Sequence, residues 1–160
     1  MELRVGNGFD IHVFSDDASR KLVLAGVHFE GETALEGHSD ADVVSHAVAE
    51  ALLGAVGLGD LGSHFPDTDE RFRGADSLVL LAEVVAEIQR EGWSVSNVDC
   101  SVVAERPKLA PRREEMQQRL GAVVGAPVSV KGRRAEGVGA LGRSEGIVCL
   151  ASALLVREDS

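Results

Sequence analysis

Hydrophobic residues alternate with polar ones in some stretches of the chain and recur every three to four residues in others. Residues 3–14 alternate, with Val5, Ile11 and Val13 at apolar positions, which predicts a β-strand. Shorter apolar runs predict further strands over 22–30, 94–104 and 127–131. Residues 145–156 are apolar at both odd and even positions, which predicts a strand in the centre of a sheet.

Helices are predicted between these strands. A stripe containing Val44, Val48 and Leu52 predicts a helix over 41–56, with Ser39 or Asp40 as its N-cap. A second helix is predicted over 76–91, capped by Asp76 or Ser77 and ended by Gly92, and a third from Pro111 to about residue 124. Because no linker or repeat interrupts this succession, we expect one α/β domain over residues 1–160, with helices packed on a sheet.

The composition is that of a globular domain. The 160 residues are 44% apolar and 26% charged. No apolar run reaches the roughly 18 residues that a membrane span needs, and we expect no secretory signal at the start of the chain. Cys100 and Cys149 lie outside any zinc-type spacing and predict buried free thiols in a reducing compartment, the cytoplasm. The absence of tyrosine argues against stacking of single-stranded nucleic acid.

Charge is distributed unevenly along the chain. Residues 1–105 hold 6 Lys and Arg against 20 Asp and Glu, whereas residues 106–143 hold 9 against 3. The overall charge of −10 makes the protein a poor partner for DNA or anionic lipid. The basic segment suits a small anion such as a phosphate ester, although three of its arginines are equally compatible with a solvated helix face. Four of its basic residues lie instead among glycines: Lys131, Arg133, Arg134 and Arg143.

Candidate metal ligands occur on the first predicted strand and the first predicted helix. Asp10 and His12 share one face of a strand and form either a hydrogen-bonded pair or two zinc ligands. His46 is either a third ligand or a core histidine beside the apolar stripe. Asp42 lies one helical turn before His46 and could be a fourth ligand, a partner that orients a histidine, or an acid that stabilises the helix N-terminus. His38 precedes the helix, where it is either an anion-binding residue or a surface histidine.

A glycine-rich segment follows the strand predicted over 127–131. Its glycines allow close approach to a ligand, and its arginines offer forked donors to phosphate. Glu136 in the same segment could hold Mg²⁺ on a substrate phosphate. The segment lacks the G-x-x-x-x-G-K-[ST] pattern of a P-loop.

Taken in order, these motifs resemble 2-C-methyl-D-erythritol 2,4-cyclodiphosphate synthase, a family of the non-mevalonate route to isoprenoids. The similarity extends over about residues 3–157. The matching blocks are RVGNGFDIH (4–12), GHSDADV (37–43) with His46 and Ala47, GLGDLG (57–62), FPDTD (65–69), GADS (74–77), PKL (107–109) and the pattern E-x-x-G-x-x-G-R-x-E-G (136–146).

The resemblance implies a role for each matching position. Asp10, His12 and His46 match zinc ligands that also lie against the substrate, and Glu136 matches the carboxylate that helps hold a second divalent cation, Mg²⁺ or Mn²⁺. His38 and Ser39 match a loop at the methylerythritol phosphate and diphosphate, where His38 is implied to be catalytic. Contacts on the erythritol side correspond to Asp60, Gly62, Phe65, Asp67 and Asp69. The cytosine pocket corresponds to Ala104, Pro107, Lys108 and Leu109, and the phosphate region to Arg143.

The resemblance also implies a reaction and an assembly. The 2-phosphate of 4-diphosphocytidyl-2-C-methyl-D-erythritol 2-phosphate attacks the β-phosphorus, CMP leaves and a cyclodiphosphate forms. Such phosphoryl transfer needs positioning and charge neutralisation, and no strong general base. The family fold is a single α+β domain with a mixed sheet and helices packed on one face. It forms a homotrimer with sites between subunits, and it involves neither nucleic acid nor a membrane.

One departure concerns the residues before Glu136. The family has threonines where this chain has Arg133 and Arg134, and one of them is thought to stabilise the transition state. Arg134 therefore either supplies a cationic version of that catalytic contact or obstructs the nucleotide. Two other functions stay open. One is a metal-dependent phosphohydrolase that uses the same Asp/His/His site, and the other is a non-catalytic trimer that binds a cytidine nucleotide or an isoprenoid phosphate. Arg133 and Arg134 are the residues that keep the second of these open.

Overall fold

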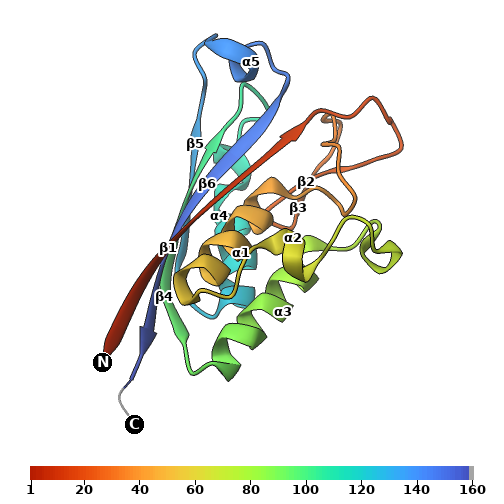
Figure 1. Ribbon diagram of the computed structural model, residues 1–160. Helices are drawn as coiled ribbons and strands as arrows, with labels where there is room; N and C mark the ends of the chain where they lie inside the picture. Colours follow the sequence, from red (N-terminus) through yellow and green to blue (C-terminus); the bar gives the residue numbers. More distant parts are fainter. Residues whose placement is uncertain (159–160) are drawn as a thin grey trace.

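The computed structural model describes residues 1–158, which form a four-stranded sheet, a small hairpin and several helices (Figure 1). The sheet strands are β1 (Glu2–Val13), β4 (Ser94–Val103), β5 (Val128–Arg133) and β6 (Gly146–Arg157), and the hairpin strands are β2 (Leu22–Leu24) and β3 (Val27–Phe29). The helices are α1 (Val43–Val56), α2 (Leu61–His64), α3 (Ser77–Arg90), α4 (Arg113–Val124) and α5 (Gly139–Gly142), with short 3₁₀ turns η1 (Glu70–Phe72) and η2 (Ala110–Arg112).

The sheet is mixed, with strand order β1-β6-β4-β5. β6 pairs antiparallel with both β1 and β4, whereas β4 and β5 pair in parallel. The central position predicted for residues 145–156 is confirmed. The connection from β4 to the parallel strand β5 contains α4, which packs on β5.

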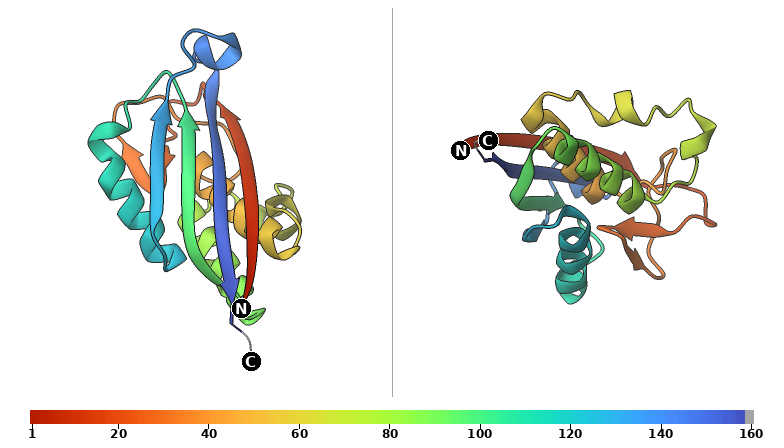
Figure 2. Two further views of the ribbon diagram at one scale, coloured as in Figure 1. Left: turned by 90° about the vertical axis from the view of Figure 1, so that its left-hand side faces the viewer. Right: turned by 90° about the horizontal axis from the view of Figure 1, so that it is seen from below.

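The longer helices all lie on one face of the sheet, as Figure 2 shows from two directions. α1 packs against β1 and β6, α3 packs against α1, and α4 packs against α3 and β5. The core between these layers is aliphatic, with side chains such as Leu52, Leu81, Met116, Leu120 and Leu155 almost fully buried. The predicted α+β domain with a mixed sheet and helices on one face is therefore confirmed.

Three predicted elements differ in detail. The strand expected over 22–30 is a hairpin, because Ala25 and Gly26 adopt positive φ angles of 54° and 71° and reverse the chain. The N-cap of α1 is Asp42, and neither Ser39 nor Asp40 caps the helix. The third predicted helix begins as a 3₁₀ turn at Ala110 before it becomes α-helical.

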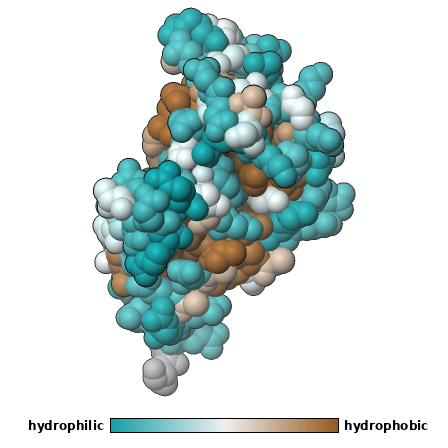
Figure 3. Space-filling view, turned by 90° about the vertical axis from the view of Figure 1, so that its right-hand side faces the viewer, coloured by the Kyte–Doolittle hydropathy of each residue, from teal (hydrophilic) through white to brown (hydrophobic). Residues whose placement is uncertain are grey.

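The opposite face of the sheet is uncovered in the single chain. Alternate side chains of β1 point to this face, and they are large and apolar: Leu3, Val5, Phe9, Ile11 and Val13 are all more than half exposed, and Leu150 of β6 is nearly so. The side that carries the helices and loops is instead mainly hydrophilic, with separated apolar patches (Figure 3). None of the helices within residues 1–158 has both the length and the apolar character that crossing a bilayer requires.

Both cysteines are buried and free, as predicted. They lie on neighbouring strands, β4 and β6. A hydrogen bond with Cys100, together with burial, raises the pKa of the Cys149 thiol above its ordinary value. This thiol is therefore protonated at neutral pH and is an inert core residue.

Two glycines on the inner face of β1 set how closely α1 approaches the sheet. A Cβ atom at Gly6 would lie 2.0 Å from the carbonyl oxygen of Ala51, and one at Gly8 would lie 1.9 Å from that of Ala47. Any side chain at either position would push the helix away. The next inward-facing residues of β1 are Asp10 and His12, so the same close approach brings them to α1.

Candidate metal centre and active site

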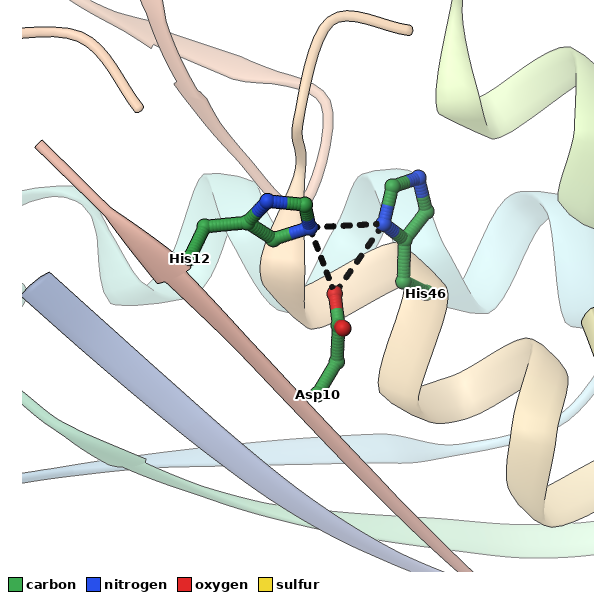
Figure 4. Close-up of side chains that lie close together, drawn as sticks. All are labelled: Asp10, His12 and His46. Carbon is green, nitrogen blue, oxygen red and sulfur yellow. Dashed lines mark hydrogen bonds and ion pairs between the residues drawn. The ribbon is translucent and has the colours of Figure 1, made fainter. Parts of the chain in front are cut away.

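Three side chains from two elements converge at the end of this helix–strand contact. Asp10 and His12 come from β1 and His46 comes from the first turn of α1 (Figure 4). The Asp10 carboxylate oxygen Oδ2 lies 3.0 Å from both His12 Nε2 and His46 Nδ1. The two ring nitrogens are 3.3 Å apart. All three residues are half-buried or buried.

This spacing fits three ligands on one metal ion. Donors at about 2.0–2.1 Å from a tetrahedral ion are separated by about 3.3 Å. Two imidazoles and a carboxylate are a donor set that Zn²⁺ accepts, and three protein ligands leave a fourth position open for a substrate oxygen. The structure thus brings together the three residues that the sequence proposed as zinc ligands.

The backbone orients one of the two imidazoles. The Nδ1–H group of His12 donates to the carbonyl oxygen of Glu36 at 2.6 Å. A carbonyl only accepts, so Nδ1 carries a hydrogen. Nε2 is then the ring nitrogen that faces Asp10 and His46, where it can bind a metal ion or, without one, donate a hydrogen bond to Asp10. The carbonyl of Glu36 was missed by the sequence analysis, because nothing in a residue's type reveals where its backbone will point.

The electrostatics of the metal-free centre follow from the same contacts. Burial acts to raise the pKa of Asp10, but hydrogen bonds with His12 and His46 outweigh it and hold the pKa far below its ordinary value. Burial acts to lower the pKa of His12, but the hydrogen bond with Asp10 outweighs it and raises the pKa. The centre therefore favours a carboxylate surrounded by positive charge, which a metal cation also supplies.

Asp42 is a helix cap and has no place in the metal centre. Its side chain is fully buried and accepts hydrogen bonds from the backbone N–H groups of Val44 and Ser45, and from those of Ala25 and Gly26 in the β2–β3 turn. Of the three roles considered for Asp42, the stabilising acid at the helix N-terminus is confirmed. The carboxylate also joins the hairpin to α1, which the sequence did not indicate.

The three donors open into a cavity of about 510 Å³. Its wall includes eight residues proposed from the sequence: Asp10, His12, His38, Ser39, His46, Gly62, Phe65 and Asp67. The far wall comes from the segment around α2 and η1. Glu50 of α1 holds this segment by accepting a hydrogen bond from the Leu61 N–H at 2.8 Å, and His64 pairs with Glu87 of α3 at 3.2 Å.

Some predicted contacts on this side have other partners. The Asp60 carboxylate caps α2 by accepting from the Ser63 N–H at 2.7 Å. The Asp69 carboxylate pairs with Arg71 at 2.6 Å, and its carbonyl accepts a hydrogen bond from His38 Nε2 at 2.9 Å. Neither carboxylate lines the cavity of the single chain. In this chain the two carboxylates hold the loop in place, and the Asp69 carbonyl holds His38.

A second cavity of about 220 Å³ lies at the C-terminal ends of β4 and β5, beside the loop that leads through η2 into α4. Six of the predicted nucleotide and phosphate residues line it: Ala104, Pro107, Lys108, Leu109, Arg133 and Arg134. The wall also includes two charged residues that the sequence analysis did not name, Glu105 and Arg113. The wall therefore carries four basic side chains against one acid, which suits an anionic ligand.

Arg134 is already paired in this cavity. Its guanidinium donates to Glu105 Oε2 at 2.8 Å, and this ion pair lowers the pKa of Glu105. The Arg134 side chain is 68% exposed, whereas the Glu105 side chain is 11% exposed. Because the Arg134 guanidinium is exposed while its partner Glu105 is mostly covered, Arg134 can also donate to a ligand phosphate.

Besides Asp60 and Asp69, two further predicted residues line neither cavity. Glu136 is exposed in the loop between β5 and α5, with a positive φ of 54°. Arg143 is also exposed and pairs with Glu145 at 2.7 Å. Within the single chain the structure does not bring Glu136 to the Asp10–His12–His46 centre, and the two cavities share no wall residue.

A three-donor centre inside a cavity, on a mixed sheet backed by helices, defines this chain as an α+β protein with a candidate catalytic metal site. Comparison with known proteins assigns the family. The sequence model of the YgbB family matches residues 3–156, and the chain belongs to this family.

Relatives in this family have named activities. A protein from Neisseria gonorrhoeae named 2-C-methyl-D-erythritol 2,4-cyclodiphosphate synthase is 49% identical over 97% of this chain and 98% of its own length. The bifunctional enzyme IspD/IspF of Anaeromyxobacter dehalogenans is 54% identical over 95% of this chain, and the chain spans 39% of that longer protein. The structure of Plasmodium falciparum IspF in a CDP complex superimposes with a TM-score of 0.85 at 30% identity, covering 98% of this chain and 97% of that one.

Proposed function

We propose that this protein converts 4-diphosphocytidyl-2-C-methyl-D-erythritol 2-phosphate to 2-C-methyl-D-erythritol 2,4-cyclodiphosphate and CMP. The observation that carries the proposal is the convergence of Asp10, His12 and His46 on one point of a 510 Å³ cavity. The near-full-length relative that bears the synthase name supports the same reaction. The enzyme is then a phosphorus–oxygen lyase of isoprenoid biosynthesis.

The residues of the first cavity hold the methylerythritol end of the substrate. His38 and Ser39 lie beside the three donors, and Phe65 and Asp67 form the opposite wall. These groups orient the 2-phosphate toward the β-phosphorus and exclude water from it. When bound, Zn²⁺ at the three donors and Mg²⁺ or Mn²⁺ near Glu136 neutralise charge on the phosphate oxygens.

The second cavity holds the cytidine end. Its basic wall, with Lys108, Arg133 and Arg134, neutralises the diphosphate, whose α-phosphate leaves as part of CMP while the β-phosphate stays in the cyclic product. The CDP bound in the Plasmodium relative supports a cytidine nucleotide as ligand. Arg134, which is ion-paired with Glu105, then makes the phosphate contact that the family assigns to threonine.

A homotrimer joins the two ends of the site. The two cavities of one chain share no wall residue, so one substrate molecule is held by the first cavity of one subunit and the second cavity of its neighbour. The uncovered apolar face of the sheet, with Val5, Phe9 and Ile11, supplies the surface that assembly buries. Sedimentation is expected to give the mass of three chains, and a monomer would contradict this part of the proposal.

The free thiols of Cys100 and Cys149 support a cytoplasmic location.

The reaction is tested with purified protein, the substrate, Zn²⁺ and Mg²⁺, with products followed by mass spectrometry. Equal amounts of CMP and cyclodiphosphate are expected. Release of inorganic phosphate would identify a phosphohydrolase instead. Binding of the nucleotide without CMP release would identify the non-catalytic binder, with Arg133 and Arg134 as the residues that changed its use.

A further inference from the structure

The orientation of His46 is not explained by its metal-side contacts. Its Nδ1 atom faces Asp10 and His12, whereas its Nε2 atom faces away from them into the protein. There Nε2 lies 2.8 Å from the Ser77 hydroxyl, at the first residue of α3. Ser77 is 1% exposed and does not line the cavity.

The direction of the hydrogen bond between His46 Nε2 and Ser77 follows from the other partner of the Ser77 hydroxyl, Asp40. The Ser77 hydroxyl also forms a short hydrogen bond with Asp40 Oδ1. A carboxylate only accepts, so the Ser77 hydroxyl gives its hydrogen to Asp40 and its oxygen accepts from His46. Nε2 of His46 therefore carries a hydrogen, which leaves Nδ1 as the ring nitrogen that can bind a metal ion.

Asp40 is itself held by the backbone. Its Oδ1 atom accepts from the Asp42 N–H and its Oδ2 atom accepts from the Ser77 N–H, both at 3.0 Å. Both carboxylate oxygens thus face donors, which fixes the side chain. The Ser39 hydroxyl lies 3.2 Å from the same Nε2 atom, but it is farther than Ser77.

We propose that Ser77 and Asp40 are positioning residues for the metal centre, which fix His46 in the form that offers Nδ1 to a divalent cation. Together with the Glu36 carbonyl on His12, this leaves three acceptors, Asp10 and one nitrogen of each ring, facing one another at 3.0–3.3 Å. Three such acceptors require a cation between them: protons on the ring nitrogens fill this role when no metal is bound, and a divalent cation replaces them when it binds. The inference rests on the metal site of the proposed function and is independent of its reaction.

Ser77→Ala tests these hydrogen bonds directly, because it removes the hydroxyl that links His46 to Asp40. Alanine removes the hydroxyl and keeps the backbone N–H that joins α3 to Asp40. Ser45→Ala is the matched control, because Ser45 is equally buried and adjacent to His46, yet its hydroxyl donates to the cap Asp42 at 2.7 Å. Ser77→Thr keeps the hydroxyl and is expected to restore metal binding.

The first measurement is zinc affinity, by competition with a chromophoric chelator and without substrate. Ser77→Ala is expected to weaken zinc binding by about 10- to 100-fold, the usual effect of removing a partner of a ligating histidine. Ser45→Ala and Ser77→Thr are expected to stay within about threefold of the parent. An unchanged affinity in Ser77→Ala, or an equal loss in Ser45→Ala, would overturn the proposal.

The second measurement needs no variant and remains decisive even if Ser77→Ala fails to fold. Long-range ¹H–¹⁵N spectra of the unaltered, metal-free protein report whether Nε2 of His46 carries a hydrogen. A hydrogen on Nε2 is expected, whether or not Nδ1 is also protonated beside Asp10, and an Nε2 atom without a hydrogen would refute the assignment. A failed CMP assay with these results intact would refute the reaction alone.

Discussion

Gly8→Ala is expected to separate α1 from β1 and so dismantle the metal centre from a distance. The new Cβ would lie 1.9 Å from the Ala47 carbonyl oxygen and 2.7 Å from the Ala51 nitrogen. Both atoms belong to the helix backbone, so no side-chain rotation relieves the clash. Since Cβ contacts with such atoms do not fall below about 3 Å, the helix must retreat by about 1 Å.

A retreat of about 1 Å is large on the scale of the site. Metal–ligand distances tolerate about 0.2 Å, and His46 moves with α1 whereas Asp10 and His12 stay with β1. Zinc affinity and kcat/KM are therefore expected to fall about 100-fold or more. Forcing an extra methyl group into this contact also lowers the free energy of unfolding by about 1–3 kcal/mol.

The assay pairs urea denaturation in the presence of a chelator with zinc competition. Gly54→Ala is the control, because Gly54 lies in the same helix but a Cβ there would be 3.9 Å from the nearest atom, the Asn7 carbonyl oxygen. That change is expected to leave zinc affinity unaltered and to stabilise the helix by about 0.5–1 kcal/mol. A Gly8→Ala protein with parental zinc affinity would refute the argument that the glycine sets the geometry of the site.

Three further predictions concern the two cavities. His46→Ala is expected to lose zinc and activity while the fold persists, because a three-ligand site cannot spare one ligand; metal analysis and circular dichroism check this. Arg134→Thr is expected to keep kcat within about tenfold, or ~1.4 kcal/mol, because the family's own residue then occupies the position; steady-state kinetics measure it. Lys108→Ala is expected to raise KM more than it lowers kcat, because Lys108 lines the proposed nucleotide cavity; the same kinetics separate the two.

Each of these predictions has an outcome that would contradict it. Retained zinc stoichiometry in His46→Ala would remove that residue from the metal centre. A thousandfold loss in Arg134→Thr would show that the arginine has become essential to this enzyme. An unchanged KM in Lys108→Ala would place the nucleotide elsewhere.

The sequence by itself determined the elements and the types of the metal ligands. Alternation over 3–14 placed Asp10 and His12 on one strand face, and the stripe over 41–56 placed His46 on a helix, because side-chain direction follows from local backbone period. Ordered motifs over nearly the whole chain also indicated the family, which the comparison confirmed. The unbroken apolar run over 145–156 correctly placed β6 in the centre of the sheet.

Only the tertiary structure decided how these parts meet. Asp42 looked like a possible ligand and is a cap, because its environment includes the turn at Ala25, 17 positions away in the chain. The hydrogen bond from His46 to Ser77 joins residues 31 positions apart, and no local pattern encodes such a distance. The division of the predicted substrate residues between two cavities likewise depends on how α2 packs on α1 and how α4 packs on β5. Periodicity reports the direction of a side chain within its own element, whereas the partner it meets depends on packing between elements.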